Sequence, residues 1–219
     1  MAEKIKLKFI IDEKKDYYVW LSFFRNSNTF GEDNYKDNKK IFELMKKTHY
    51  FPEIFPIIKN KYYTKKQVNR FNVDFKKEII INMPTIIKQL EEIHKKPFPK
   101  KIKSVHFYFT SFSRSPYNIK ENLFYMFVNR TILPNKKEYV ELVNHELMHL
   151  FFHYYFEKKF IKKKISKEDI NDIKEALTIL INDKGYEKHK TLRKEILKEW
   201  KKQKDFNKLI DFLLDKFAI

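Results

Sequence analysis

One continuous stretch of the chain, Tyr139 to Phe156, is apolar on nearly every face of the helix that its spacing predicts. A helix of this kind has to be surrounded by protein, so the rest of the chain must fold around it. The stretch nevertheless carries His145, Glu146 and His149. Burying these polar groups without partners would cost on the order of several kcal/mol in total. A metal ion is the simplest single partner for all three.

The spacing of the two histidines supports this interpretation. His145 and His149 are four residues apart, which places both imidazoles on one face of the helix. Two imidazoles in this arrangement can bind one zinc ion, and Glu146 beside the first can accept a proton from the water on the metal. The alternative is a pair of core histidines that are satisfied by hydrogen bonds.

A catalytic zinc site usually needs a third protein ligand. His153 continues the four-residue spacing, but it lies about 6 Å further along the helix axis than His149 and overshoots the metal. The arrangement in which a later histidine does bind is H-E-x-x-H-x-x-G-x-x-H. Here Phe152 stands at the glycine position and Tyr155 at the last histidine. We therefore expect His153 to be a neighbour of the site or a core histidine.

A carboxylate from the next predicted helix is the better third ligand. Glu175 falls opposite the apolar face of that helix, on a polar side where no lysine stands, in a chain that is 35% charged. A polar, uncharged face is typical of a helix that lines a wet cleft. We expect Glu175 to complete the site, with Asp172 and His189 as alternatives.

Composition narrows the possibilities further. The chain has no cysteine, so any metal must be bound by His, Asp or Glu, and its two glycines exclude a glycine-rich phosphate loop. The net charge of +18 permits non-specific contact with polyanions, although five of the 47 basic residues are arginine and the excess also fits a bias towards lysine codons. We expect a cytoplasmic protein, because no stretch resembles a signal peptide or a membrane span.

The remaining patterns predict an α+β fold, mostly helical, with a small antiparallel or mixed sheet beside the zinc-binding helix. Residues 5–12, 104–112 and 122–131 are typical of strands, the last two as a hairpin or as a pair of sheet strands. Residues 17–26 fit a strand or a helix, and residues 26–38 fit a polar loop. Residues 95–101, with two prolines, indicate a linker between an N-terminal region, 1–100, and a zinc-site domain, 101–219.

Helices are predicted by apolar periodicity and by capping residues. The periodic segments are 39–51, 62–94 with a break at Met83–Pro84, and one or two helices within 190–219. Asn135 with Glu138 indicates the start of the central helix, which "EKKFIKKK" (157–164) should end. Ser166 with Asp169 starts another helix, which ends near Asn182 before Gly185.

These residues resemble the gluzincin zinc metallopeptidases, and in compactness the small single-domain gluzincins. That family carries H-E-x-x-H on one helix and a glutamate ligand on a following helix. The resemblance covers roughly residues 104–185. It implies that His145, His149 and Glu175 bind Zn2+, that Glu146 is the general base, and that the substrate is a peptide paired with an edge strand. The G-x-M-E-N motif of aminopeptidase relatives is absent, which favours an endopeptidase.

One departure concerns the orientation of the zinc histidines. Ile179 occupies the position of an aspartate that orients a ligand histidine in well-known members, so Asp172 or Asn182 would have to take this role. The donor that stabilises the oxyanion is open, with Tyr186, His189, His153 and Tyr154 as candidates. Two other functions stay possible: an inactive metal-binding relative, or a basic nucleic-acid-binding protein in which the motif is structural.

Overall fold

The computed structural model describes residues 5–25, 32–112, 116–127, 136–181 and 187–218. The chain divides into two compact units, each made from two stretches of sequence. Residues 1–80 and 104–139 form the first, here called the sheet unit, and residues 81–103 and 140–219 form the second, the helical unit. The chain passes between these units at 80–81, 103–104 and 139–140, whereas the sequence suggested a single division near residue 100.

The predicted fold class is confirmed, because the described residues form mostly helices and one small mixed sheet. The strands are β1 (Lys6–Ile10), β2 (Ser104–Thr110), β3 (Tyr117–Asn118) and β4 (Leu123–Phe127). The α-helices are α1 (Glu13–Arg25), α2 (Glu32–Lys47), α3 (Phe51–Tyr62), α4 (Lys65–Asn69), α5 (Lys76–His94), α6 (Lys136–Tyr155), α7 (Glu157–Lys162), α8 (Lys167–Leu177), α9 (Lys190–Gln203) and α10 (Phe206–Phe217). Single-turn elements are a π-helix (Arg70–Phe75) and 3-10 turns (Ile119–Glu121, Thr178–Ile181 and Glu187–His189).

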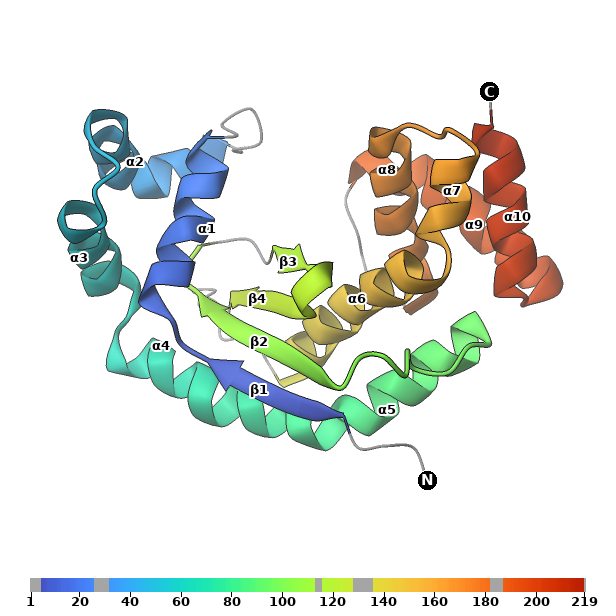
Figure 1. Cartoon of the computed structure of the whole chain (residues 1–219), viewed down its shortest axis with the longest axis horizontal. Helices are drawn as coiled ribbons and strands as arrows, with labels where there is room; N and C mark the ends of the chain where they lie inside the picture. Colours follow the sequence, from blue (N-terminus) through green and yellow to red (C-terminus); the bar gives the residue numbers. More distant parts are fainter. Residues whose placement is uncertain (1–4, 26–31, 113–115, 128–135, 182–186, 219) are drawn as a thin grey trace. The chain divides into compact units, whose positions relative to one another are not determined.

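The sheet has the strand order β1-β2-β4-β3 (Figure 1). β2 pairs in parallel with β1 and with β4, and only β3 is antiparallel to its neighbour. Of the two arrangements expected for the second and third predicted strands, the sheet pair is therefore the one that forms. A hairpin is ruled out because β2 and β4 run in the same direction, joined by a crossover that contains β3.

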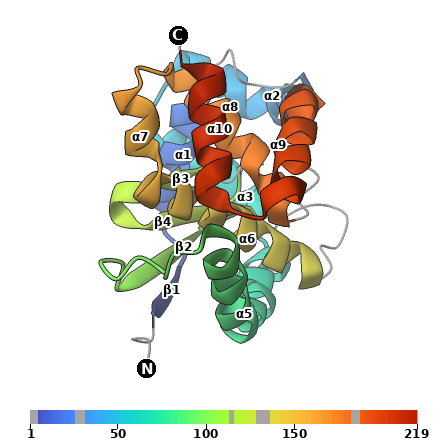
Figure 2. The ribbon, with the colours of Figure 1, turned by 90° about the vertical axis from the view of Figure 1, so that its right-hand side faces the viewer.

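The helical unit contains α5 from Ile81 onward, α6 from Val140 onward, and the helices α7 to α10. α8 packs on α9, and α9 and α10 run side by side (Figure 2). The centre of this unit contains His94, whose ring lies 4.7 Å from that of Phe151 and 4.3 Å from that of Phe206. Of the one or two amphipathic helices expected in residues 190–219, two are present, α9 and α10.

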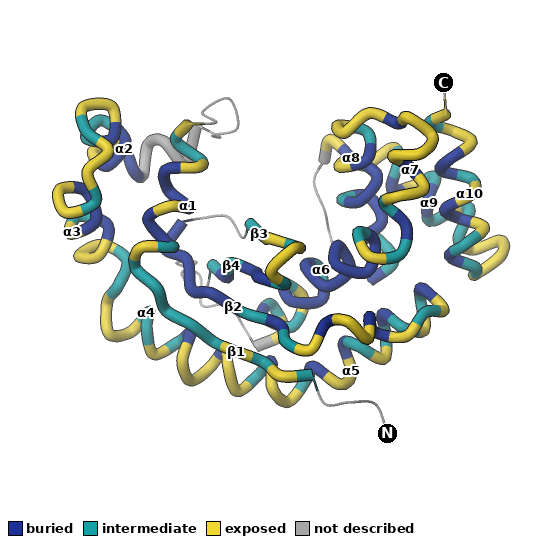
Figure 3. The backbone as a smooth tube through the Cα atoms, in the orientation of Figure 1, coloured by how far each residue is buried: buried dark blue, intermediate teal, exposed yellow. Residues whose placement is uncertain are grey.

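The central helix α6 is buried, as its composition predicted (Figure 3). From Tyr139 to Phe152 its apolar residues are buried except Val140 and Leu142, which are partly exposed, and Tyr154 near its end is 40% exposed. The proposed cap at Asn135 lies outside the described residues. α6 is followed at once by the short helix α7, so the lysine-rich segment that was expected to end the helix forms another one.

One face of the sheet packs on the π-helix between α4 and α5. The wide π turn brings the rings of Phe71 and Phe75 into a stack with centroids 5.4 Å apart. Phe75 then contacts Phe107 of β2 at 5.8 Å, and Phe71 contacts Phe109 at 5.7 Å. All four of these side chains are fully buried. Nothing in the sequence pattern distinguishes this π turn from an ordinary helical turn.

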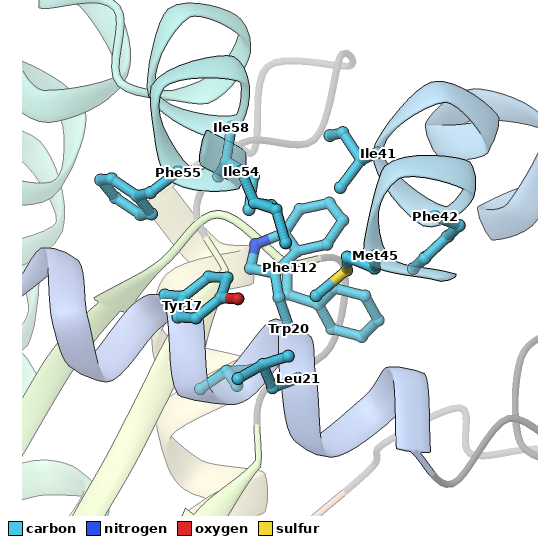
Figure 4. Packing of buried hydrophobic residues seen from close by; sticks show 11 residues of the cluster. Tyr17, Trp20, Leu21, Ile41, Phe42, Met45, Ile54, Phe55, Ile58 and Phe112 are labelled. Carbon is cyan, nitrogen blue, oxygen red and sulfur yellow. The ribbon is translucent and has the colours of Figure 1, made fainter. Parts of the chain in front are cut away.

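A second cluster of the sheet unit packs α1, α2 and α3 around Trp20 (Figure 4). Trp20 is fully buried, and its ring contacts that of Phe112 at 5.0 Å just beyond β2. The segment that fitted either a strand or a helix is thus α1, whose buried face includes Tyr17, Trp20 and Leu21. This spacing follows the helical period and accounts for the choice.

Asp16 joins α1 to the end of β2. Its carboxylate is fully buried and accepts hydrogen bonds from the Thr110 hydroxyl at 2.7 Å and the Ser111 amide at 3.0 Å. The Ser111 hydroxyl and the Tyr63 hydroxyl also donate to it, the latter at 2.9 Å. Burial raises the pKa of Asp16, and these donors oppose that rise. The group is a buried polar link within the sheet unit.

Three sequence expectations are corrected. Pro84 does not end a helix: α5 continues through it, and the ring lies on the exposed side, where water can satisfy the carbonyl left without its helical donor. α2 begins at Glu32, inside the expected loop 26–38. The expected linker 95–101 is packed, since the Phe98 amide donates to Glu91 at 2.6 Å and the Pro97 carbonyl accepts from Tyr155 at 2.6 Å.

Candidate metal centre

The two histidines of α6 face the same point. The Nε2 atoms of His145 and His149 are 2.9 Å apart, and their rings are nearly perpendicular, at 80°. The His145 side chain is 19% exposed and the His149 side chain 1%. The four-residue spacing on a helix thus produces the convergence expected from it.

Glu175 of α8 faces the Nε2 atoms of both histidines. Its Oε2 atom is 3.5 Å from Nε2 of His145, and its Oε1 atom is 3.3 Å from Nε2 of His149. α8 begins at Ser166, whose hydroxyl accepts from the Asp169 amide at 3.0 Å, as the capping pattern predicted. The apolar face of α8 is buried, and Glu175 is on another side of the helix, 17% exposed.

Together the three side chains form a group that could hold a metal ion. One ligand atom from each of His145, His149 and Glu175 lies within 4.8 Å of the others. The ionisation states suit this role. Burial lowers the pKa of His149 to about 3, so its imidazole is neutral at physiological pH. Burial alone would raise the pKa of Glu175, but hydrogen bonds with both histidines and the charge of Lys174 outweigh it and hold that pKa well below its usual range.

The backbone of Glu175 is anchored at the end of α8. Its carbonyl oxygen accepts hydrogen bonds from the Thr178 hydroxyl at 2.7 Å and from the Arg193 guanidinium at 3.2 Å. Arg193 comes from α9, is 4% exposed, and also donates to the Thr178 hydroxyl at 2.8 Å. A cation at a helix C-terminus is favourable there because it faces the carbonyl end of the helix dipole. Sequence reasoning did not identify Arg193.

A second residue that sequence reasoning missed is Lys174. Its side chain is 6% exposed, and its Nζ atom lies 3.3 Å from Oε1 of Glu175. The helical projection placed Lys174 away from the polar face, because it treats a side chain as pointing straight out from its Cα. A lysine stem is long enough to return its ammonium group to the neighbouring face.

Three other predicted residues, His153, Asp172 and His189, make contacts outside the group of three. Nδ1 of His153 is 2.8 Å from the Glu157 carboxylate, in agreement with its exclusion as a ligand. Asp172 accepts from Lys188 at 2.9 Å and is 3.8 Å from Nδ1 of His189, which is 3% exposed. Burial, the largest cause, lowers the pKa of His189.

Two further candidates, Tyr186 and Asn182, lie outside the described residues. Tyr154 is 40% exposed. The predicted general base, Glu146, follows His145 on α6 and is 5% exposed. Its neighbour Asn144, on the other side of His145, donates to Gln89 at 3.0 Å and so fixes α6 against α5 in the helical unit.

Comparison of the chain with protein-family models, with curated proteins and with solved structures found no match. The resemblance to gluzincins therefore stays a prediction that rests on residues of α6 and α8. Among the described residues, none of the helices combines the length and the hydropathy that crossing a bilayer requires.

Proposed function

We propose that the protein is a zinc-dependent metalloendopeptidase that uses His145, His149 and Glu175 as metal ligands and Glu146 as general base. The observation that carries the proposal is the position of Glu175, a residue from a separate helix, opposite the H-E-x-x-H pair. The motif alone would fit a structural histidine pair. A carboxylate 26 residues after His149 in sequence that faces both Nε2 atoms is what a three-ligand site needs.

The separations of the donor atoms fit a zinc ion. In tetrahedral coordination with bonds of about 2.0–2.1 Å, neighbouring ligand atoms lie about 3.3 Å apart. The three observed separations are 2.9 Å for the two histidines, 3.3 Å for His149 with Glu175, and 3.5 Å for His145 with Glu175. Two imidazole nitrogens and one carboxylate are also the donor set found in catalytic zinc sites that keep one position open.

The chemistry divides between the ion and the protein. A zinc ion supplies Lewis-acid chemistry, since it polarises a carbonyl and lowers the pKa of a water towards neutrality. The Glu146 carboxylate, buried next to the first ligand, accepts the proton of the attacking water and returns it to the leaving amine. The hydrogen bonds from Thr178 and Arg193 to the Glu175 carbonyl fix the backbone position of the third ligand at the end of α8.

The test measures zinc content and peptide cleavage in the same protein. We expect about one zinc ion per chain after dialysis, and cleavage of an unstructured peptide that Glu146→Gln lowers by about 10²–10⁴-fold without loss of zinc. His149→Ala should lose the zinc. Glu157→Gln is the matched control, because it makes the same change in a glutamate that pairs with His153 outside the group.

Two results would overturn the proposal. One is a zinc content below about a tenth of an ion per chain in protein that has been offered the metal. The other is cleavage that Glu146→Gln leaves unchanged. Zinc without cleavage, together with tight and salt-sensitive DNA binding, would favour the basic nucleic-acid-binding alternative, for which the net charge of +18 is the supporting observation.

A further inference from the structure

A buried lysine is an unusual component of a cation-binding site. Lysine side chains are almost never fully buried unless they are paired. Lys174 is 6% exposed and its ammonium group is paired with Oε1 of Glu175 at 3.3 Å. The same oxygen is 3.3 Å from Nε2 of His149. The carboxylate that faces the two histidines is therefore already neutralised by a positive charge of the protein itself.

This pairing works against the binding of a divalent cation. In the metal-free protein the positive ammonium group of Lys174 lies against the negative carboxylate of Glu175. A divalent cation held by Glu175 would place two more positive charges beside a buried ammonium group. Like charges repel each other strongly in a poorly solvated interior. The ammonium group and the metal also compete for the same carboxylate oxygen.

We propose that Lys174 is an internal counter-cation that holds the metal-free site in its binding geometry and lowers its affinity for metal. The inference rests on the proposed function, because it assigns a role to Lys174 within the same zinc site. Its consequence is a protein that keeps His145, His149 and Glu175 together without metal and gains activity only when zinc is plentiful enough to displace the lysine. The zinc supply then regulates the enzyme.

Arg193 does not share this role, although it is a second buried cation near Glu175. Its guanidinium donates to the backbone carbonyl of Glu175 and to the Thr178 hydroxyl. Those contacts are compatible with metal binding because they leave the carboxylate oxygens available. Lys174 is the cation whose contact is with a ligand atom itself.

The experiment compares zinc affinities of full-length variants by competition with a chelator. Lys174→Met removes the charge and keeps most of the stem, and Lys174→Gln is a second neutral variant in case the first fails to fold. Lys174→Arg keeps the charge. Lys188→Met is the matched control. Lys188 is 63% exposed and pairs with Asp172, which lies on α8 like Lys174 but outside the group of three.

The neutral variants should bind zinc at least about tenfold more tightly than the wild-type protein. Lys174→Arg and Lys188→Met should stay within about threefold of wild type. Without metal, Lys174→Met should melt at a lower temperature than wild type, and zinc should raise its melting temperature by more. These readouts do not depend on catalysis.

The inference fails if the neutral variants bind zinc as weakly as wild type or more weakly, since Lys174 would then support the site or be indifferent to it. That result leaves the peptidase proposal intact if wild type binds zinc and cleaves. Conversely, tighter zinc binding by Lys174→Met together with unchanged cleavage by Glu146→Gln would uphold the counter-cation and overturn the peptidase. If neither wild type nor any variant binds zinc, both proposals are overturned.

Discussion

His94 should make the helical unit sensitive to acid. Its side chain is fully buried among the rings of Phe151, Phe156 and Phe206, and Nδ1 lies 2.7 Å from the Leu90 carbonyl. Nδ1 therefore donates, and a proton added to the ring has to go to Nε2, which makes no hydrogen bond with the described residues. Burial lowers the pKa of His94 to about 4.

The sign and size of the effect follow from this pKa. Between about pH 6.5 and pH 4 the unfolded chain binds a proton at His94 and the folded chain does not, so the free energy of unfolding decreases as the pH falls. A tenfold difference in proton affinity corresponds to about 1.4 kcal/mol, so the whole interval costs the folded state about 3 kcal/mol. His94→Phe removes this dependence and retains a ring among the aromatic neighbours.

The assay is urea unfolding of the full chain at several values between about pH 4.5 and pH 7, followed by tryptophan fluorescence. Trp20→Phe leaves Trp200 of α9 as the reporter, whose ring is 6.5 Å from that of Phe206 beside His94. In this background His94→Phe should flatten the loss of stability with acid, and exposed His49→Phe should not. An identical pH dependence with and without His94 would refute the reasoning.

Three further predictions concern single contacts. Asp16→Ala should destabilise the sheet unit by about 3–5 kcal/mol in urea unfolding, because it leaves three buried donors and one partly buried donor without their acceptor; a loss below about 1 kcal/mol would contradict this. Ser166→Ala should cost about 1 kcal/mol by removing the cap of α8, measured as a lower melting temperature; no change would show that the cap is dispensable. Arg193→Met should weaken zinc binding by about 3–10-fold, since it loosens the anchor of Glu175; unchanged affinity in the chelator assay would show that the anchor plays no part.

The parts of the structure that periodicity determines could be predicted from the sequence. The burial of α6, the cap of α8 and the approach of Glu175 to the two histidines depend on which residues share a helix face, and this can be counted along the chain. The strand segments were also predicted. Their direction was not, because a strand that is largely buried is mostly apolar whichever way its neighbour runs, and the residue pattern does not record that direction.

Other features depend on contacts between distant segments and leave no periodic trace. The composition of the two compact units is one example, since 104–139 joins 1–80 although a proline-rich segment separates them. That segment has the composition of a linker, yet Phe98 is held by Glu91 and by a ring contact with Phe151 at 5.7 Å. Prolines limit the backbone without determining whether a segment is packed or loose.

The same distinction separates the two kinds of residue in the candidate metal centre. His145, His149 and Glu175 have short side chains whose direction follows from their position on a helix, so counting by the helical period predicts where their donor atoms lie. The side chains of Lys174 and Arg193 have several rotatable bonds, so their position on the helix does not determine where their charged groups lie. The Lys174 ammonium group is attracted by the Glu175 carboxylate, and the Arg193 guanidinium by the Glu175 backbone carbonyl. A search for metal ligands by spacing therefore finds the groups that could hold a metal ion and misses the buried cations beside them.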